Sequence, residues 1–221
     1  LIANGAGEHR QPSFDMRPQW GGFPWGNSDY VSINPRRHLP EFMRKCAARG
    51  LRIGLSTWLT NDTSDRATVI ASPADLADCW SATLEFLGEH GLLGMVEWVD
   101  LGNEFPSVAF MPSVVAHINS GLDSTNQIGR LHGYLRPYTP AQGVAISTYM
   151  QQAITTLKTR FPSLPFCFSL LGDGTTATFA HHDLSCFDLL EPHIWLGQNT
   201  RFGLRSGLDL FLLEGFGPVQ T

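Results

Sequence analysis

Two polar residues, Asn103 and Glu104, end the apolar stretch VEWVDLGNEFP, which runs from Val96 to Pro106. A carboxylate and an amide are costly to bury without hydrogen-bond partners. A carboxylic acid whose pKa is raised by partial burial can supply a proton near neutral pH, which makes Glu104 a candidate general acid or base. A plain strand-end turn, with Asn103 as turn former and Glu104 as the charge at a helix N-terminus, is the structural alternative.

Other polar and aromatic residues follow the remaining predicted strands, whereas the helix-to-strand turns ARGLR and EHGLLG carry little chemistry. This asymmetry indicates one functional face at the carboxyl edge of a parallel sheet. The residues concerned are Trp58, Asn61, Asp62, Asp173, His193 and Trp195.

Several aromatic side chains could bind a sugar, because an aromatic ring offers a flat apolar surface to the CH groups of a pyranose. These are Trp20, Trp25, Tyr30 and Trp58. Core packing is the alternative for each of them, but Trp20 and Trp25 lie in a Gly- and Pro-rich segment, and such segments run along surfaces. His193 is equally compatible with a hydrogen-bonded core position, and the neighbouring Trp195 favours the site.

The positioning elements alternate between strand and helix. Helices are predicted from Leu39 to Ala48, from a capping box at Ser72 and Pro73 to Gly91, and from Thr139 and Pro140 to about Arg160. Strands are predicted at 51–59, 94–104, 165–173 and 187–196, and the region from Pro106 to Tyr138 is predicted to be irregular. Alternation of this kind produces parallel sheets.

A (β/α)8 barrel is favoured over a doubly wound sheet, because no glycine-rich phosphate-binding turn follows any predicted strand. A complete barrel needs eight strands and about 250 residues, whereas about four strands are identified in these 221 residues. We therefore expect a single, incomplete barrel domain over residues 1–221, in which 1–36 form an aromatic-rich loop region. Open sheet edges would make such a fragment unstable by itself.

Composition excludes several functions. The chain is 43% hydrophobic and 16% charged, with a net charge of -5 and no basic stripe, which argues against nucleic acid or a membrane surface as partner. No C-x-x-C pair is present, so the four cysteines are interpreted as small buried residues. The chain opens at Leu1 with no visible signal peptide, which leaves a cytoplasmic or a secreted location open.

The strand ending in GNEFP resembles the fourth barrel strand of glycoside hydrolases of the cellulase superfamily, which ends in Asn-Glu-Pro. LRIGLSTWL is similar to the third strand and EPHIWL to the sixth, and most of the chain resembles bacterial proteins described as cellulase-like. The resemblance implies that Glu104 is the general acid/base, that Asn103 binds the sugar hydroxyl next to the reacting carbon, and that His193 and Trp195 lie beside the nucleophile. Phe105 before Pro106 departs from the pattern.

A retaining mechanism would need a second carboxylate about 5 to 5.5 Å from Glu104. The family has its nucleophile on strand seven, and Glu214, the one acidic residue late enough, follows Trp195 too closely, so the nucleophile is expected outside this chain. Glu191 is expected to make structural hydrogen bonds. No cofactor is required, and a β-linked oligo- or polysaccharide is the expected substrate.

Two alternatives stay open. One is an inactive carbohydrate-binding barrel that has lost its second carboxylate. The other is a metal-dependent hydrolase or lyase that uses Glu104 with Asp173 or His193. His181, His182 and Asp183 suggest no metal site, because adjacent side chains point to different sides and no third ligand has matching spacing.

Overall fold

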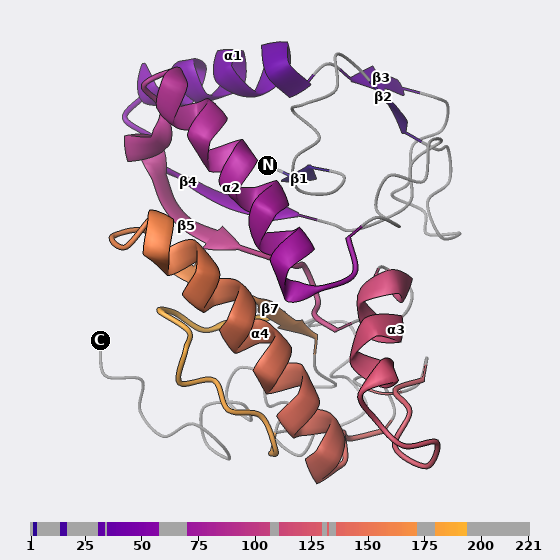
Figure 1. Ribbon diagram of the computed structural model, residues 1–221. Helices are drawn as coiled ribbons and strands as arrows, with labels where there is room; N and C mark the ends of the chain where they lie inside the picture. The colour runs from indigo at the N-terminus through magenta and orange to yellow at the C-terminus, as the bar shows by residue number, and fades with distance from the viewer. Residues whose placement is uncertain are drawn as a thin grey trace, which may run out of the picture.

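The computed structural model describes residues 2–3, 14–16, 31–33, 35–57, 70–106, 111–129, 132, 136–171 and 180–193. These residues form a mixed structure of helices and parallel strands (Figure 1). The candidate site residues Trp20, Trp25, Trp58, Asp173 and Trp195 lie outside the described residues, as does Glu214, which is not expected to be the nucleophile.

One four-stranded parallel sheet has the order β1 (Ile2–Ala3), β4 (Ile53–Thr57), β5 (Val96–Asp100) and β6 (Phe166–Cys167). A second parallel pair joins β7 (Ser169–Leu171) to β8 (Glu191–His193). A parallel bridge from Phe105 to Leu170 connects the end of β5 to β7. Neighbouring strands thus follow the order of the sequence without reversal, which is the order a barrel requires.

The predicted strands and helices are largely confirmed. The strand predicted at 51–59 is β4, that at 94–104 contains β5, and that at 187–196 contains β8. The strand predicted at 165–173 is two short strands, because β6 ends at Cys167 and β7 begins at Ser169. Within the 1–36 region, the described residues include a short antiparallel pair, β2 (Phe14–Met16) and β3 (Val31–Ile33).

Two helices begin at the caps that the sequence predicts, and both caps are capping boxes. At α2 (Pro73–Glu89) the Ser72 hydroxyl accepts the Asp75 N–H at 3.1 Å, and the Asp75 carboxylate accepts the Ser72 N–H at 2.8 Å. The Ser72 hydroxyl also donates to the Asp75 carboxylate at 2.7 Å, and this bond, together with the one from the Ser72 N–H, lowers the pKa of Asp75. At α4 (Pro140–Arg160) Thr139 and Gln142 form the same reciprocal pair. Both caps satisfy backbone donors that a helix start otherwise leaves unpaired.

The prediction of an irregular region from Pro106 to Tyr138 was wrong, because α3 (Pro112–Ser120) lies within it. Its N-cap residue is Met111, which makes no side-chain cap hydrogen bond. The start of α3 therefore lacks the polar signal by which α2 and α4 are recognised. A further helix, α1 (Pro35–Ala47), and the single turn η4 (Leu93–Met95) complete the described elements.

Helices α2 and α4 lie over one side of the sheet (Figure 1), and one large apolar cluster packs between the helices and the strands. Leu55, Val99 and Phe166 from neighbouring strands pack in it together with residues of α2 and α4. Among the four cysteines, which are all free thiols, Cys167 is fully buried, but Cys46, Cys79 and Cys186 are only half-buried. The prediction that all four are buried is thus right for one of them. Across the described part of the chain, every helix is too short or too polar to cross a membrane.

Candidate active site

The candidate site is the turn Leu101–Pro106, which follows β5 and is buried at every residue. Its two polar side chains, Asn103 and Glu104, are each only 5% exposed. Glu104 adopts a positive φ of 56°, a left-handed backbone conformation that residues other than glycine rarely adopt. The turn therefore holds Glu104 in an uncommon backbone conformation.

Each backbone N–H from Leu101 to Phe105 has an acceptor. Leu101 donates to the Cys167 carbonyl, Asn103 to the Thr57 carbonyl and Phe105 to the Ser169 carbonyl, at 2.8 to 2.9 Å. The two remaining acceptors are side chains. The Gly102 N–H donates to Asp100 Oδ1 at 3.2 Å, and the Glu104 N–H donates to the Ser169 hydroxyl at 3.0 Å. The turn is thus tied to β4 on one side and to β6 and β7 on the other.

The Phe105 side chain, which departs from the Asn-Glu-Pro pattern, lies in the core. Its ring centroid is 4.5 Å from that of Phe168 and 5.5 Å from that of Tyr149. The peptide bond between Phe105 and Pro106 is cis, and the Pro106 carbonyl accepts a hydrogen bond from the Tyr138 hydroxyl. The Phe105 ring therefore packs the turn against the core, and its presence before Pro106 leaves the Asn103–Glu104 pair unchanged.

The Asn103 amide retains an unused donor. Its Nδ2 atom is buried and has no hydrogen-bond partner among the described residues. A buried amide donor without a partner costs about 1 to 3 kcal/mol, so such groups in native proteins call for an explanation. A bound ligand with an oxygen acceptor would satisfy it.

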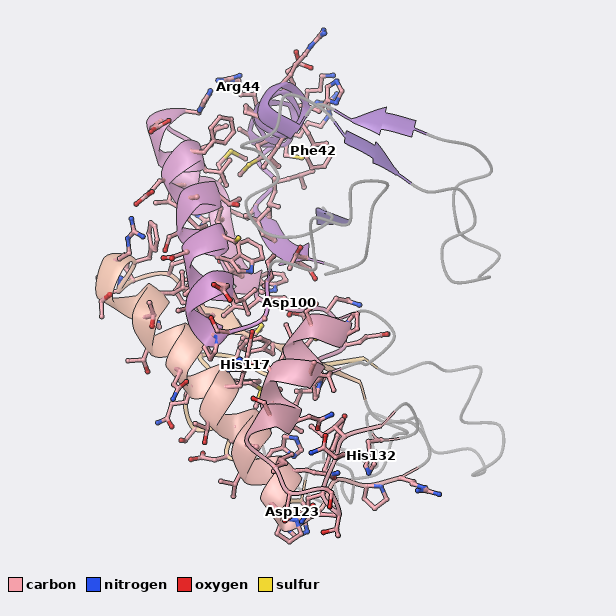
Figure 2. All side chains as sticks on the ribbon, turned by 45° about the vertical axis from the view of Figure 1, so that its right-hand side comes forward. Phe42, Arg44, Asp100, His117, Asp123 and His132 are labelled. Atoms are coloured by element: carbon pink, nitrogen blue, oxygen red, sulfur yellow. The ribbon has the colours of Figure 1, made fainter. Side chains whose placement is uncertain are left out.

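Asp100, at the end of β5, is a central residue that the sequence interpretation missed. Its carboxylate is fully buried and accepts hydrogen bonds from the Ser56 hydroxyl at 2.5 Å, the Ser169 N–H at 2.7 Å, the Ser169 hydroxyl at 2.9 Å and the Gly102 N–H. Figure 2 shows Asp100 in the middle of the molecule. The signal was present, because an aspartate inside an apolar strand must have partners.

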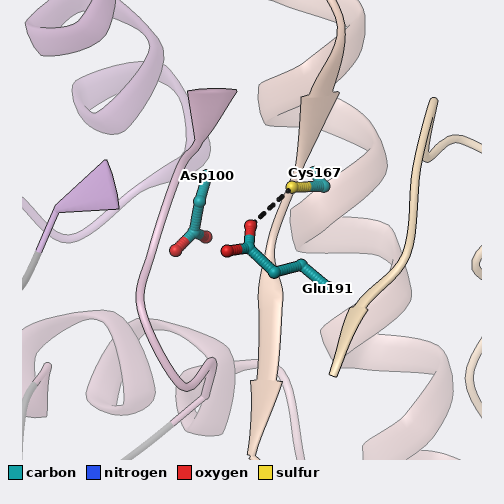
Figure 3. A group of neighbouring side chains, drawn as sticks. All are labelled: Asp100, Cys167 and Glu191. Carbon is teal, nitrogen blue, oxygen red and sulfur yellow. Dashed lines mark hydrogen bonds between the residues drawn. The ribbon is translucent and has the colours of Figure 1, made fainter. Parts of the chain in front are cut away.

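Burial raises the pKa of Asp100 to about 6, against the hydrogen bonds from Ser56 and Ser169, which favour the charged form. The Glu191 carboxylate on β8 acts in the same direction as burial. Figure 3 shows the Asp100 and Glu191 carboxylates next to each other, with the Cys167 thiol beside them. Two acids therefore face each other on the same side of the sheet.

Glu191 makes the structural hydrogen bonds expected from the sequence. Its Oε2 atom accepts from the Trp98 indole at 3.3 Å and from the Cys167 thiol at 3.5 Å. His193 lies two residues further along β8, where its backbone pairs with Leu171, but its side chain is not among those described.

Asp100, Cys167 and Glu191 have the residue types of a metal site, with ligand atoms within 4.8 Å of one another. Their contacts argue for an internal hydrogen-bond network. Four hydrogen-bond donors already occupy the Asp100 oxygens. Burial is the main reason that the pKa of the Cys167 thiol is raised, and a raised pKa disfavours the thiolate that metals bind. His181 is exposed, and the Asp183 carboxylate accepts the Ser185 N–H at 2.9 Å.

Comparisons with known proteins identify the family. The chain is similar to a protein from Parabacteroides distasonis ATCC 8503, described as a "putative glycoside hydrolase", whose crystal structure matches with a TM-score of 0.69 at 25% identity. The match covers 86% of this chain but 46% of that one, so the chain spans about half the length of this neighbour. No curated protein matches. The model of the cellulase-like family, described as sugar-binding cellulase-like, matches residues 1–216, and the chain belongs to this family.

Proposed function

We propose that the protein is a retaining glycoside hydrolase acting on β-linked glycosides, built on a (β/α)8 barrel, with Glu104 as general acid/base. The observation that carries the proposal is the buried Asn103 amide, which has an unused donor next to Glu104 within a turn whose backbone N–H groups are otherwise paired. A sugar hydroxyl would satisfy that donor. The cellulase-like family and the sequential order of the parallel strands support the reaction and the barrel.

In the proposed reaction, Glu104 donates its proton to the glycosidic oxygen while an opposing carboxylate attacks the anomeric carbon, and the bond to the leaving group breaks. A water molecule then attacks the glycosyl ester. Glu104, now a carboxylate, takes the proton of that water, which frees the sugar with its configuration retained. Asn103 positions the sugar, and the nucleophile lies outside the described residues. His193, Trp195, Trp58, Trp25 and Trp20 remain candidate substrate contacts.

The test compares Glu104→Gln with wild type in the full-length protein on two β-glucosides or β-cellobiosides, one with a phenyl and one with a 2,4-dinitrophenyl leaving group. A good leaving group departs without protonation, so the variant should lose about 10²- to 10⁴-fold in kcat/KM on the phenyl glycoside and much less on the activated one. Glu97→Gln is the matched control, because Glu97 is an exposed residue of β5 that pairs with Arg52 at 2.6 Å. Unchanged turnover of the phenyl glycoside by Glu104→Gln would refute the assignment.

A second candidate function is sugar binding without hydrolysis, which the description of the family as sugar-binding favours. In that case wild type would bind oligosaccharides in calorimetry but release no product from either glycoside. Asn103→Ala would then weaken binding, because the amide donor is lost.

A further inference from the structure

Ser169, the first residue of β7, lies between the Asp100 carboxylate and the Glu104 backbone. Its N–H and its hydroxyl both donate to Asp100, at 2.7 and 2.9 Å. Its hydroxyl oxygen also accepts the Glu104 N–H at 3.0 Å, and its carbonyl accepts the Phe105 N–H at 2.8 Å. Because the Ser169 hydroxyl donates its hydrogen to Asp100, the lone pairs of its oxygen point elsewhere and one of them can accept the Glu104 N–H.

Glu104 needs such support because of its backbone conformation. A residue other than glycine at a φ of 56° costs on the order of 1 to 2 kcal/mol, and it stays there only when the surrounding structure imposes the conformation. The direction in which the Glu104 side chain leaves the turn depends on this φ. The hydrogen bond from the Glu104 N–H to Ser169 is therefore a geometric constraint on the carboxyl group.

We propose that Asp100 and Ser169 are positioning residues for Glu104, in which Asp100 orients the Ser169 hydroxyl and that hydroxyl fixes the left-handed backbone from which the acid/base projects. The proposal rests on the function proposed for Glu104 and adds two residues to it. Neither residue donates a proton to the substrate; both act through the geometry of Glu104.

The ionisation of Asp100 links this arrangement to pH. The carboxylate accepts from Ser56 on β4 and from Ser169 on β7, and the titratable groups that face it are Glu191 on β8 and Cys167 on β6. The pKa of Asp100 is about 6, so in acid it gains a proton that competes with the donors around it. Below about pH 6 the Ser169 hydroxyl then loses its charged acceptor, and Glu104 is held less firmly.

The test is the ratio of kcat/KM for the 2,4-dinitrophenyl glycoside to that for the phenyl glycoside, measured in the full-length protein. A variant that is only partly folded loses activity equally on both substrates, so the ratio responds only to acid assistance. In Ser169→Ala the acid should be misplaced, which typically costs about 10²-fold when a reacting group moves by about 1 Å, and the loss should fall on the phenyl glycoside. If Ser169→Ala is insoluble, Ser169→Cys, with a weaker acceptor of similar size, is measured in the same way.

Ser147→Ala is the matched control. Ser147 is also a buried serine whose hydroxyl accepts a backbone N–H, that of Asp183 at 2.8 Å, but it lies on α4 away from Glu104. Its ratio should equal that of wild type. Asp100→Asn should raise the ratio about tenfold, and the wild-type ratio should rise as pH falls through about 6, a change that Asp100→Asn removes.

The outcomes separate the two proposals. If Glu104→Gln raises the ratio but Ser169→Ala and Asp100→Asn behave like Ser147→Ala, the positioning inference is overturned and the proposed function stands. If Glu104→Gln leaves the ratio unchanged, the proposed function is refuted. A raised ratio in Glu104→Gln, Ser169→Ala and Asp100→Asn, with an unchanged ratio in Ser147→Ala, supports both.

Discussion

The two faces of the parallel sheet have opposite chemistry, although they are built from adjacent residues. Helices α2 and α4 cover one face of the sheet (Figure 1), and on that face Leu55, Val99 and Phe166 are neighbours across the strands and belong to the apolar cluster. On the other face their neighbours Ser56, Asp100 and Cys167 are joined to Ser169 and Glu191 by hydrogen bonds. Side chains alternate between faces along a strand, so of two consecutive residues one packs in the apolar cluster and the other joins the hydrogen-bonded polar network.

The difference between the faces also predicts how substitutions on each face affect the protein. The apolar face is stabilised by burial in proportion to area, and its residues should affect folding without changing the reaction. The polar face is stabilised by paired groups, and removing one partner leaves another unsatisfied. Substitutions there should alter pH dependence and the geometry of the turn.

The largest effect on stability is expected on the apolar face. Phe166→Ala removes a fully buried ring and should lower the free energy of unfolding by about 3 to 5 kcal/mol, measured by denaturant unfolding of the full-length protein. Phe42→Ala is the control, since Phe42 on α1 is 43% exposed, and it should change stability by about 0.5 kcal/mol or less. A change in the leaving-group ratio for Phe166→Ala would break the separation between the faces.

On the polar face, the pKa of Asp100 should make stability fall as pH rises. The folded state keeps the Asp100 proton up to about pH 6 and the unfolded state releases it near 3.8, so the folded state binds more protons in this window. The difference corresponds to about 3 kcal/mol at most. Thermal unfolding should show that the stability of wild type relative to Asp100→Asn decreases from about pH 4 to about pH 6.

Asp123→Asn is the control with the opposite sign. Hydrogen bonds from Thr125 and Asn126 lower the pKa of Asp123, so its contribution is present above 3.8 and is lost only as pH falls further. Relative to wild type, this variant should show only a small slope of the opposite sign near pH 4 and none by about pH 6. An equal slope in both variants would contradict the assignment of the effect to Asp100.

A smaller effect is expected from a glycine on the polar face. A Cβ at Gly54 would lie 2.5 Å from Cε2 of the Trp98 ring, which is bound to Glu191, so Gly54→Ala should displace the indole and cost about 1 to 3 kcal/mol. Gly88→Ala is the control, because a Cβ there meets nothing within 4 Å and alanine favours helix α2. Equal stability of the two variants in chemical unfolding would show that Trp98 can move freely.

The smallest effect is expected at the surface, outside both faces. Arg160 on α4 pairs with Glu85 on α2, and both side chains are nearly half exposed. Arg160→Met should cost about 1 kcal/mol or less, and less at high salt, as measured by thermal unfolding at two ionic strengths. A larger, salt-independent loss would mean that this pair, and not the apolar face, holds the helices together.

Local signals in the sequence were enough for much of the fold. The capping boxes at Ser72 and Thr139 predicted where α2 and α4 begin, because a cap depends on residues three positions apart. The start of α3 at Pro112 carries no such cap and was missed. The break between β6 and β7 was missed for a different reason, since the apolar run through Phe168 reads as one continuous strand.

The sequence by itself determined the βα alternation, the capped helices and the position of Asn103 and Glu104 at a strand end, because these follow from periodicity and nearest neighbours. The tertiary structure alone decided that Asp100, Ser169 and Glu104 form one hydrogen-bonded chain. Asp100 and Ser169 are 69 residues apart in sequence, and only the pairing of β5 with β6 brings them together. Which side chains meet across two strands depends on which strands pair and in which register, and a shift of one residue would move Asp100 to the opposite face of the sheet.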